Sequence, residues 1–204
     1  MCNNSSCGCN FNRCTNLGPF VAVDADCITP PVTRAASVVP FSSGITTPVL
    51  LVTTIGGLVG TVSTIGFGTA NVGVTLAGGL IDLAGLTSSE SFTVPRVGNV
   101  TAISANFNTL LAATVLTGTA TIRAQIYRAP AGTNIFSPTA ATVVLAPSLT
   151  APVAAGQLSS GSASNFSVPV APGDRLLMVF STTATGLTAA VTVAGFASAG
   201  ITIE

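Results

Sequence analysis

Short apolar segments separated by glycine and proline run from Val38 to the end of the chain, and they constrain its fold most. The chain contains 21 glycines and 12 prolines. Valine, isoleucine, threonine and leucine dominate the segments between them, as strands require. No stretch keeps the apolar period of roughly 3.6 residues that an amphipathic helix shows. We therefore expect an all-β domain of about ten short strands, built as a β-sandwich or jelly roll.

The clearest strand pattern is TATIRAQIY, residues 119–127. Its two isoleucines and the alanine between them face one side, whereas Arg123, Gln125 and Tyr127 face the opposite side. We expect the first face in the core and the second face in water or at a subunit contact.

Two later segments are expected to form buried strands, RLLMVFS from Arg175 and AAVTVAGF from Ala189. Turns such as APGD, residues 171–174, connect the strands. The glycine-rich segment TIGGLVG from Thr54 does not match the dinucleotide-binding fingerprint, and no helical pattern follows it. These segments therefore indicate strands and turns and no nucleotide site.

The charge of the chain is low and balanced. Six basic and six acidic residues give a net charge of zero, and the chain has no lysine, histidine or tryptophan. Hydrophobic residues make up 48% and charged residues only 6%. This composition favours association and excludes a basic nucleic-acid-binding surface. We expect a self-assembling protein that binds no nucleic acid.

Residue types that support catalysis are sparse. Without histidine or lysine, the commonest general bases and the P-loop lysine are missing. Asp82 and Glu90 could form the carboxylate pair that glycosidases use, but isolated carboxylates at strand ends and turns are the stronger interpretation. We expect no enzymatic activity and no cofactor.

All cysteines of the chain lie near its N-terminus. They are Cys2, Cys7, Cys9, Cys14 and Cys27. Five cysteines cannot all pair within one chain, and a bridge between Cys7 and Cys9, across one glycine, would be strained. Intermolecular disulfides are the leading hypothesis, with reduced, inert thiols as an alternative. A metal site is a further alternative, but the C-x4-C-x-C-x4-C spacing lacks zinc knuckles, so we expect no metal.

The cysteines belong to an expected connector arm, residues 1–37, that precedes a β domain of residues 38–204. Prolines in and after the arm favour extended backbone. A weakly alternating segment in it is a candidate for strand addition to a neighbouring sheet edge. The candidate residues are Phe20, Val21, Ala22 and Val23. An ordered linker that lies on its own domain is an equally supported alternative.

Neither a membrane span nor a secretion signal is expected. The apolar segment VLLVTTIGGLVGTV from Val49 is too short and too rich in threonine and glycine to span a bilayer. The N-terminus lacks a cationic segment followed by an apolar run. Disulfides would then form after the producing cell lyses, because the cytosol keeps thiols reduced.

Five separated motifs carry a family resemblance. They are PFSSG (40–44), TTIGGLVGTVSTIGFG (53–68), FTVPRVGNVTAISANF (92–107), PGDRLLMVFSTTATG (172–186) and AGFASAGI (194–201). In this order they resemble the C-terminal domain of BclB-type exosporium glycoproteins, which coat the spores of bacilli and their relatives. The resemblance covers roughly residues 38–204. It implies a trimeric C1q/TNF-like jelly roll that is made in the mother cell and exposed on the spore surface.

The region before this domain departs from that family. The family has a collagen-like Gly-X-Y stalk there, whereas this chain has the cysteine arm. The arm is similar in layout to the N-terminal connectors of Ena-type endospore appendage subunits, which link stacked β-sandwiches covalently. Together the resemblances imply a structural spore-surface protein of the exosporium or of an appendage fibre. Its partners would be further copies of itself, as a homotrimer and a higher homopolymer, and other spore-surface proteins.

The alternative function is a trimeric C1q-like binding head that recognises a glycan or a receptor. Sugar recognition commonly uses exposed aromatic side chains. The chain offers only Tyr127 and ten phenylalanines for this purpose.

Overall fold

The described part of the chain consists of strands and their connections. A computed structural model describes residues 35–85, 90–112, 118–186 and 190–204. The strands are β1 (Ser37–Ser42), β2 (Val49–Thr53), β3 (Val59–Ile65), β4 (Ala70–Thr75), β5 (Ile81–Asp82), β6 (Phe92–Thr93), β7 (Gly98–Ala112), β8 (Thr119–Ala129), β9 (Ile135–Val144), β10 (Leu149–Thr150), β11 (Leu158–Val170), β12 (Arg175–Thr185) and β13 (Thr192–Ile203). No helix in these ranges has the length and apolarity of a membrane span. The cysteines and the strand-addition candidate lie outside the described residues.

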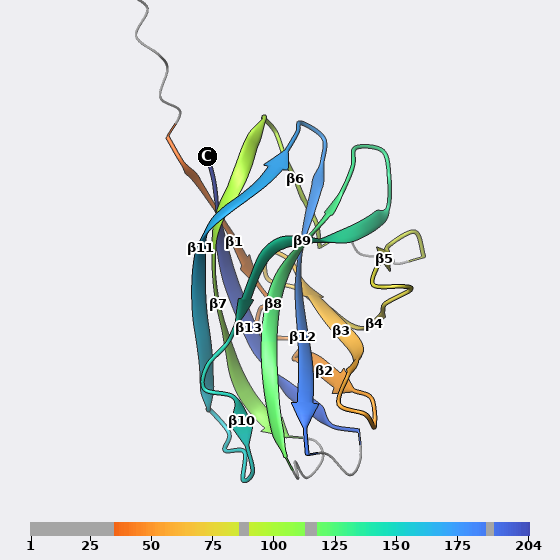
Figure 1. Cartoon of the computed structure of the whole chain (residues 1–204), viewed down its shortest axis with the longest axis vertical. Coiled ribbons are helices and arrows are strands. Elements are labelled where there is room, and N and C mark those ends of the chain that lie inside the picture. Colours follow the sequence, from red (N-terminus) through yellow and green to blue (C-terminus); the bar gives the residue numbers. More distant parts are fainter. Residues whose placement is uncertain (1–34, 86–89, 113–117, 187–189) are drawn as a thin grey trace, which may run out of the picture. The chain divides into compact units, whose positions relative to one another are not determined.

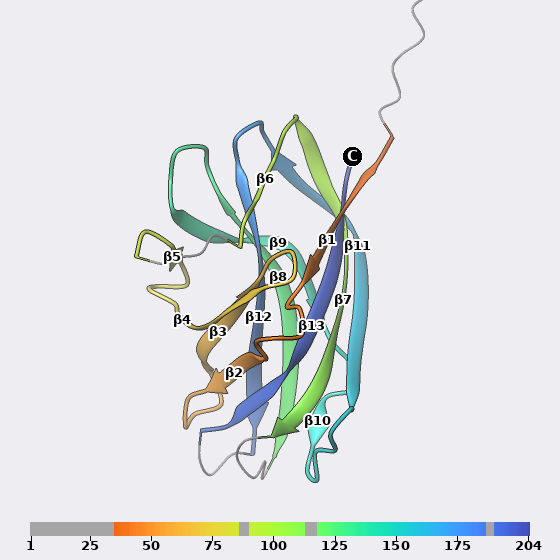
Figure 2. The same ribbon diagram turned by 180° about the vertical axis from the view of Figure 1, so that it is seen from behind.

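The strands form two packed layers (Figures 1 and 2). Sheet I has the order β1–β13–β7–β11, and sheet II has the order β4–β3–β12–β8–β9. Strand β2 pairs with both β13 and β3 and so joins the sheets at one edge. At the other edge Ala146 and Ser160 exchange backbone hydrogen bonds of 2.9 and 2.8 Å.

This strand order is that of a jelly roll. Neighbouring strands come from distant parts of the sequence, such as β1 beside β13 and β3 beside β12, and all pairs of named strands are antiparallel. Two packed antiparallel sheets with such crossovers define the jelly-roll architecture. The fold class expected from the sequence, an all-β jelly roll, is therefore confirmed.

The main core lies between the two sheets. Sheet I contributes Ile103 and Phe107, and sheet II contributes Ile122 and Phe180, all at most 1% exposed. The rings of Phe107 and Phe180 meet with centroids 6.5 Å apart. Each such side chain contributes about 1.5–3 kcal/mol through burial, so this layer holds the sheets together.

A second apolar cluster lies on the outer side of sheet II. Residues 70–85 fold over this side and cover part of it with Val74, Ile81 and Leu83. Strand β12 is consequently buried on both faces: Met178 points into the main core, and Val179 packs in the second cluster. The continuous apolar run of this strand is the pattern of a strand without a wet face.

The expected alternation of residues 119–127 holds on its inner side, where the isoleucines and alanine lie in the main core. The outer side differs from the expectation of water or a subunit contact at Tyr127, which is only 7% exposed. The second cluster of the same chain covers it. Arg123, which lies four residues earlier on the same strand, remains exposed as expected.

The expected turns are present. In residues 171–174 the amide of Asp174 donates to the carbonyl of Ala171 at 3.1 Å, and Gly173 has φ +86°. The glycine-rich segment forms the β2–β3 turn, where Gly57 has φ +77° and accepts a hydrogen bond from the amide of Ala184 at 2.8 Å. A side chain at Gly57 would overlap the backbone oxygen of Ala184, so close packing requires this glycine.

The two ends of the described domain lie together. Ser37 of β1 pairs with Ile203 of β13. Asn99 and Glu204 exchange backbone hydrogen bonds of 2.7 and 3.0 Å. The strand that opens the domain and the strand that closes it are therefore neighbours in sheet I.

Candidate assembly face

The outer face of sheet I is free of charge. None of the residues of β1, β7, β11 and β13 is charged. Buried and solvent-facing residues alternate along β13 without interruption, as they do in a strand with one covered face. The solvent-facing positions therefore form one continuous surface of uncharged side chains.

The strand register aligns small residues in rows across this face. The rows are Val38–Thr202–Ala102–Ser164, Pro40–Gly200–Ser104–Ser162 and Ser42–Ser198–Asn106–Ser160. Most of these residues are serine, alanine, glycine or threonine, whose short side chains let another backbone approach closely. Low relief of this kind suits contact between two protein surfaces.

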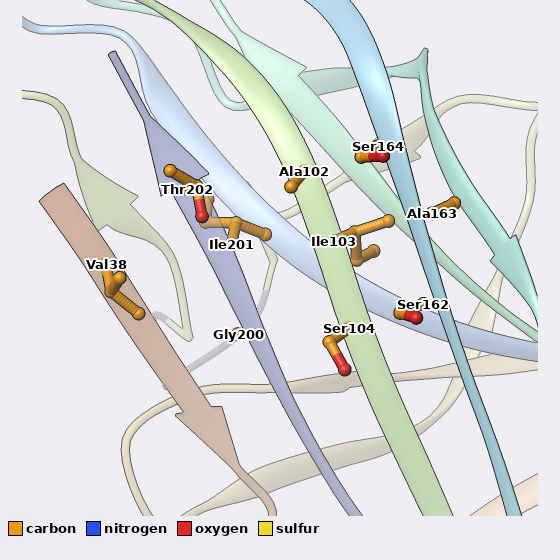
Figure 3. A pocket seen from close by; sticks show the side chains of 10 residues that line it. All are labelled: Val38, Ala102, Ile103, Ser104, Ser162, Ala163, Ser164, Gly200, Ile201 and Thr202. Carbon is orange, nitrogen blue, oxygen red and sulfur yellow. The ribbon is translucent and has the colours of Figure 1, made fainter. Parts of the chain in front are cut away.

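The first two rows border a shallow hollow. Figure 3 shows Val38 on one side of it and Ser162 and Ser164 on the other. Gly200 lies between them, on β13. The hollow has a volume of about 280 Å³. Its depth results from the small residues in the middle strands, and Val38, which is 72% exposed, forms its raised edge.

The third row is polar. The Asn106 side-chain amide donates to the Ser198 hydroxyl at 2.9 Å. This bond orients an amide in the middle of the face, where its remaining groups can bond to another chain.

The next row has apolar side chains on its two outer strands. It is formed by Phe196, Asn108 and Leu158 on three adjacent strands. Leu158 is 53% exposed, and Leu110, further along β7, is 48% exposed. The face thus combines apolar ends with a polar centre and carries no charge, and depletion of charge is the compositional mark of an interface core.

Charged side chains in the described residues lie away from this face. Arg96 precedes β7 and donates to the Ala35 carbonyl at 3.0 Å and the Ser37 hydroxyl at 2.9 Å. Arg128 pairs with Asp174 at 2.8 Å. Both interactions lie outside the rows of small residues.

The candidate carboxylate pair has structural partners. Asp82 accepts a hydrogen bond from the amide of Ala84 at 2.9 Å. Glu90 is 5% exposed and accepts a hydrogen bond from the Thr69 hydroxyl at 2.5 Å. Within the described ranges no hydrogen bond joins the two carboxylates, and no group of three or more metal-ligating side chains occurs. Each carboxylate therefore accepts a hydrogen bond within the fold, Asp82 from a nearby backbone amide and Glu90 from a threonine hydroxyl.

The sequence-predicted site residues belong to the part of the chain that the structure does not describe. Cys2, Cys7, Cys9, Cys14 and Cys27 lie outside the described residues, as does the strand-addition candidate, residues 20–23. The residues of the face carry no motif, and sequence reasoning missed them. A usable signal was available: the charge-free stretch of residues 35–81 has counterparts in residues 97–122 and 129–173.

Comparisons with known proteins identify a curated relative and structural neighbours. No family model matches the chain. "Collagen-like protein 1" of Acanthamoeba polyphaga mimivirus is 29% identical over 174 residues. This match covers 81% of the chain but only 18% of the relative, so the chain spans about a fifth of that protein's length.

Among solved structures, the match to the Eiger TNF of S. frugiperda covers 84% of this chain and 94% of the Eiger chain. Its TM-score is 0.37, and the sequence identity is 13%. The jelly-roll assignment rests on the strand order described above.

Proposed function

We propose that this protein is a structural subunit that forms a homotrimer through the outer face of sheet I. The observation that carries the proposal is the charge-free surface of small residues on β1, β13, β7 and β11. Burying an uncharged surface between subunits avoids the free-energy cost of removing an unpaired charge from water. The similarity to a protein named collagen-like supports a structural role.

Higher assembly is the second part of the proposal. The N-terminal cysteines would link trimers into a homopolymer on the spore surface, in the exosporium or in an appendage, with other spore-surface proteins as further partners. Support comes from the odd number of cysteines and their absence after Cys27, together with the family resemblances of the sequence. A covalent link raises the effective concentration of a weak contact and makes it durable.

A charge on the face tests the trimer. We expect Ser104→Arg to convert the trimer to a folded monomer, since three guanidinium groups would be buried close together without partners. The matched control is Ala140→Arg, which adds the same charge at an exposed position of β9 in sheet II. Sedimentation velocity of the full chain under reducing conditions gives the mass.

Three results would contradict this part of the proposal. They are a monomeric wild-type chain at micromolar concentration, a trimer that survives Ser104→Arg, and a trimer that Ala140→Arg dissociates equally. Immunogold labelling of intact spores tests the location, and label confined to the spore interior would contradict it.

The alternative function, a trimeric head that binds a glycan or a receptor, shares the trimer. It differs in requiring a ligand site on a surface that assembly leaves open. Such a site would have to lie away from the outer face of sheet I.

A further inference from the structure

Arg123 is distinguished from the other arginines of the described residues by its surroundings. Arg96 and Arg128 donate to protein oxygens, and Arg175 lies over the ring of Phe136 at 5.1 Å and donates to the Asn134 side chain at 2.6 Å. Arg123 is exposed on β8 and forms no ion pair with a carboxylate of the described residues. Its guanidinium group is therefore available to a ligand.

A second hollow lies beside Arg123 on the outer side of sheet II. It has a volume of about 150 Å³. Strands β8 and β12 contribute its polar lining, since Arg123 stands directly opposite Ser181 in the register. Its aliphatic lining consists of Val59, Val62, Leu76 and Val179. One wall is thus polar and the other is aliphatic.

Tyr127 lines the same hollow as Arg123 and adds a hydroxyl group to it. Burial raises the pKa of its hydroxyl, and the positive charge of Arg123 partly opposes this rise. The phenol therefore remains protonated at neutral pH and can donate a hydrogen bond near the guanidinium. The Gln125 side-chain amide nitrogen is already engaged, because it donates to the Thr139 carbonyl at 2.7 Å.

The lining specifies the chemistry of a ligand. A guanidinium group binds a carboxylate through charge-assisted, often paired hydrogen bonds. None of the carboxylates in the described residues lines this hollow, so an anion meets no like charge there. The hydroxyl groups of Ser181 and Thr183 suit ligand hydroxyls, and the valine and leucine wall suits the C–H face of a ring.

The size of the hollow limits the ligand. Pockets for drug-sized ligands measure about 300–1,000 Å³, which is larger than the hollow beside Arg123. One sugar ring or a short hydroxy acid is the size that fits.

We propose that the hollow beside Arg123 binds a small hydroxylated carboxylate, with the chemistry of a hexuronate, whose carboxylate pairs with the Arg123 guanidinium. Because this site is on sheet II and the assembly face is on sheet I, the two surfaces point away from each other. Every subunit of a homopolymer would then present one such site, and weak single contacts would add up to firm binding of a multivalent acidic surface.

Saturation-transfer difference NMR on the full chain tests the proposal, because it detects weak binding to large assemblies. The probe is sodium glucuronate, and the neutral comparison is glucose. We expect glucuronate to bind at millimolar concentration and glucose to bind at least about tenfold more weakly, since a hydrogen bond to a charged group is the stronger kind.

Two variants locate the site. Arg123→Gln should weaken glucuronate binding about tenfold or more, whereas Arg96→Gln, which removes the same charge elsewhere, should leave it unchanged. Thr183→Trp keeps the charge and fills the mouth of the hollow at an exposed position of β12, so binding should be lost. The control variant is Ala140→Trp on β9, which should still bind glucuronate.

Methyl glucuronide and gluconate distinguish a ring that is part of a glycan from a free hydroxy acid. Binding of methyl glucuronide or gluconate that is weakened by Arg123→Gln supports recognition of a hydroxylated carboxylate. The probe that binds more tightly shows whether the ligand is a ring of a glycan or a free hydroxy acid. No glucuronate binding by the wild-type chain would overturn the proposal. Equal binding of glucose, or glucuronate binding that survives Arg123→Gln or Thr183→Trp, would also overturn it. These results are independent of the Ser104→Arg test of assembly.

Discussion

Asn106 and Ser198 join the two central strands of sheet I on their solvent-facing side, through a 2.9 Å hydrogen bond from the amide to the hydroxyl. Both residues belong to the row that also contains Ser42 and Ser160. The bond fixes a polar group at the middle of a face that consists mostly of small or apolar side chains. If the face is the trimer contact, this amide lies near the contacts between subunits.

Asn106→Asp should make the trimer sensitive to pH. The substitution preserves shape but introduces a carboxylate, which is ionised above its ordinary pKa of about 3.9, and three copies would repel one another. We expect dissociation at neutral pH and recovery of the trimer in acid, after protonation, measured by sedimentation velocity. Asn106→Ala, which adds no charge, should show no such pH dependence. A trimer of Asn106→Asp as stable at neutral pH as in acid would contradict the assembly face.

Replacement of all five cysteines by serine should leave the trimer intact but shorten the higher assemblies. The physical reason is that a disulfide between subunits turns dissociation into an intramolecular opening. Non-reducing and reducing electrophoresis, with negative-stain microscopy, measure the effect, and mass spectrometry of unreduced peptides identifies the bonds. The cross-linking hypothesis fails if every disulfide lies within one chain or if all thiols of mature material are free.

Tyr127 should make the domain less stable in alkali. Its folded pKa is raised above the ordinary 10.0 by burial, so the folded state keeps the proton in a pH range where the unfolded state has lost it. The free energy of unfolding should therefore be unaffected below about pH 10 and fall as pH rises through the folded pKa.

The variant Tyr127→Phe should lack this fall. Its background is the cysteine-free chain, because thiols also titrate in alkali and no lysine is present. Denaturant unfolding at several pH values measures the free energy, and the absorbance of tyrosinate reports directly on the single tyrosine. Identical alkaline curves for the two chains would refute the role of Tyr127.

Gly57→Ala should destabilise the β2–β3 turn more than an alanine at another left-handed glycine. Both Gly57 and Gly78 have positive φ, +77° and +62°, a conformation that costs a residue with a side chain about 1–2 kcal/mol. At Gly57 the added methyl group also overlaps the Ala184 oxygen, whereas at Gly78 the space is open. Denaturant unfolding should show the larger loss for Gly57→Ala, and equal losses would exclude the steric contribution.

The strands could be predicted because their patterns are local. Alternation in residues 119–127 and the apolar run from Arg175 follow directly from which faces are covered. The burial of Tyr127 could not be predicted, because residues 70–85, which cover it, have no pattern that assigns them to the outer side of sheet II. Local periodicity shows how many faces a strand buries, but not which segment covers them.

The assembly face and the hollow beside Arg123 were not predictable for a related reason. Serine, alanine and glycine are uninformative one at a time, and they become a surface only through the register of strands as distant as β1 and β13. Arg123 was expected to face outward, but its lack of a described carboxylate partner and its position opposite Ser181 are tertiary facts. Only the absence of charge over long stretches was visible in advance.

The pairing of Ser37 with Ile203 has a consequence for protein engineering. A short peptide bridge from Glu204 to Ala35 would close the domain into a ring without breaking the β1–β13 pair, and new ends could be opened in a surface turn, as adjacent termini allow. Conversely, a cargo domain fused after Glu204 would emerge beside the strand at which residues 1–34 join the body. Cargo attached after Glu204 would therefore leave the domain next to the start of β1, to which residue 34 is joined. In a permuted chain the cargo would be attached at the new ends, away from β1.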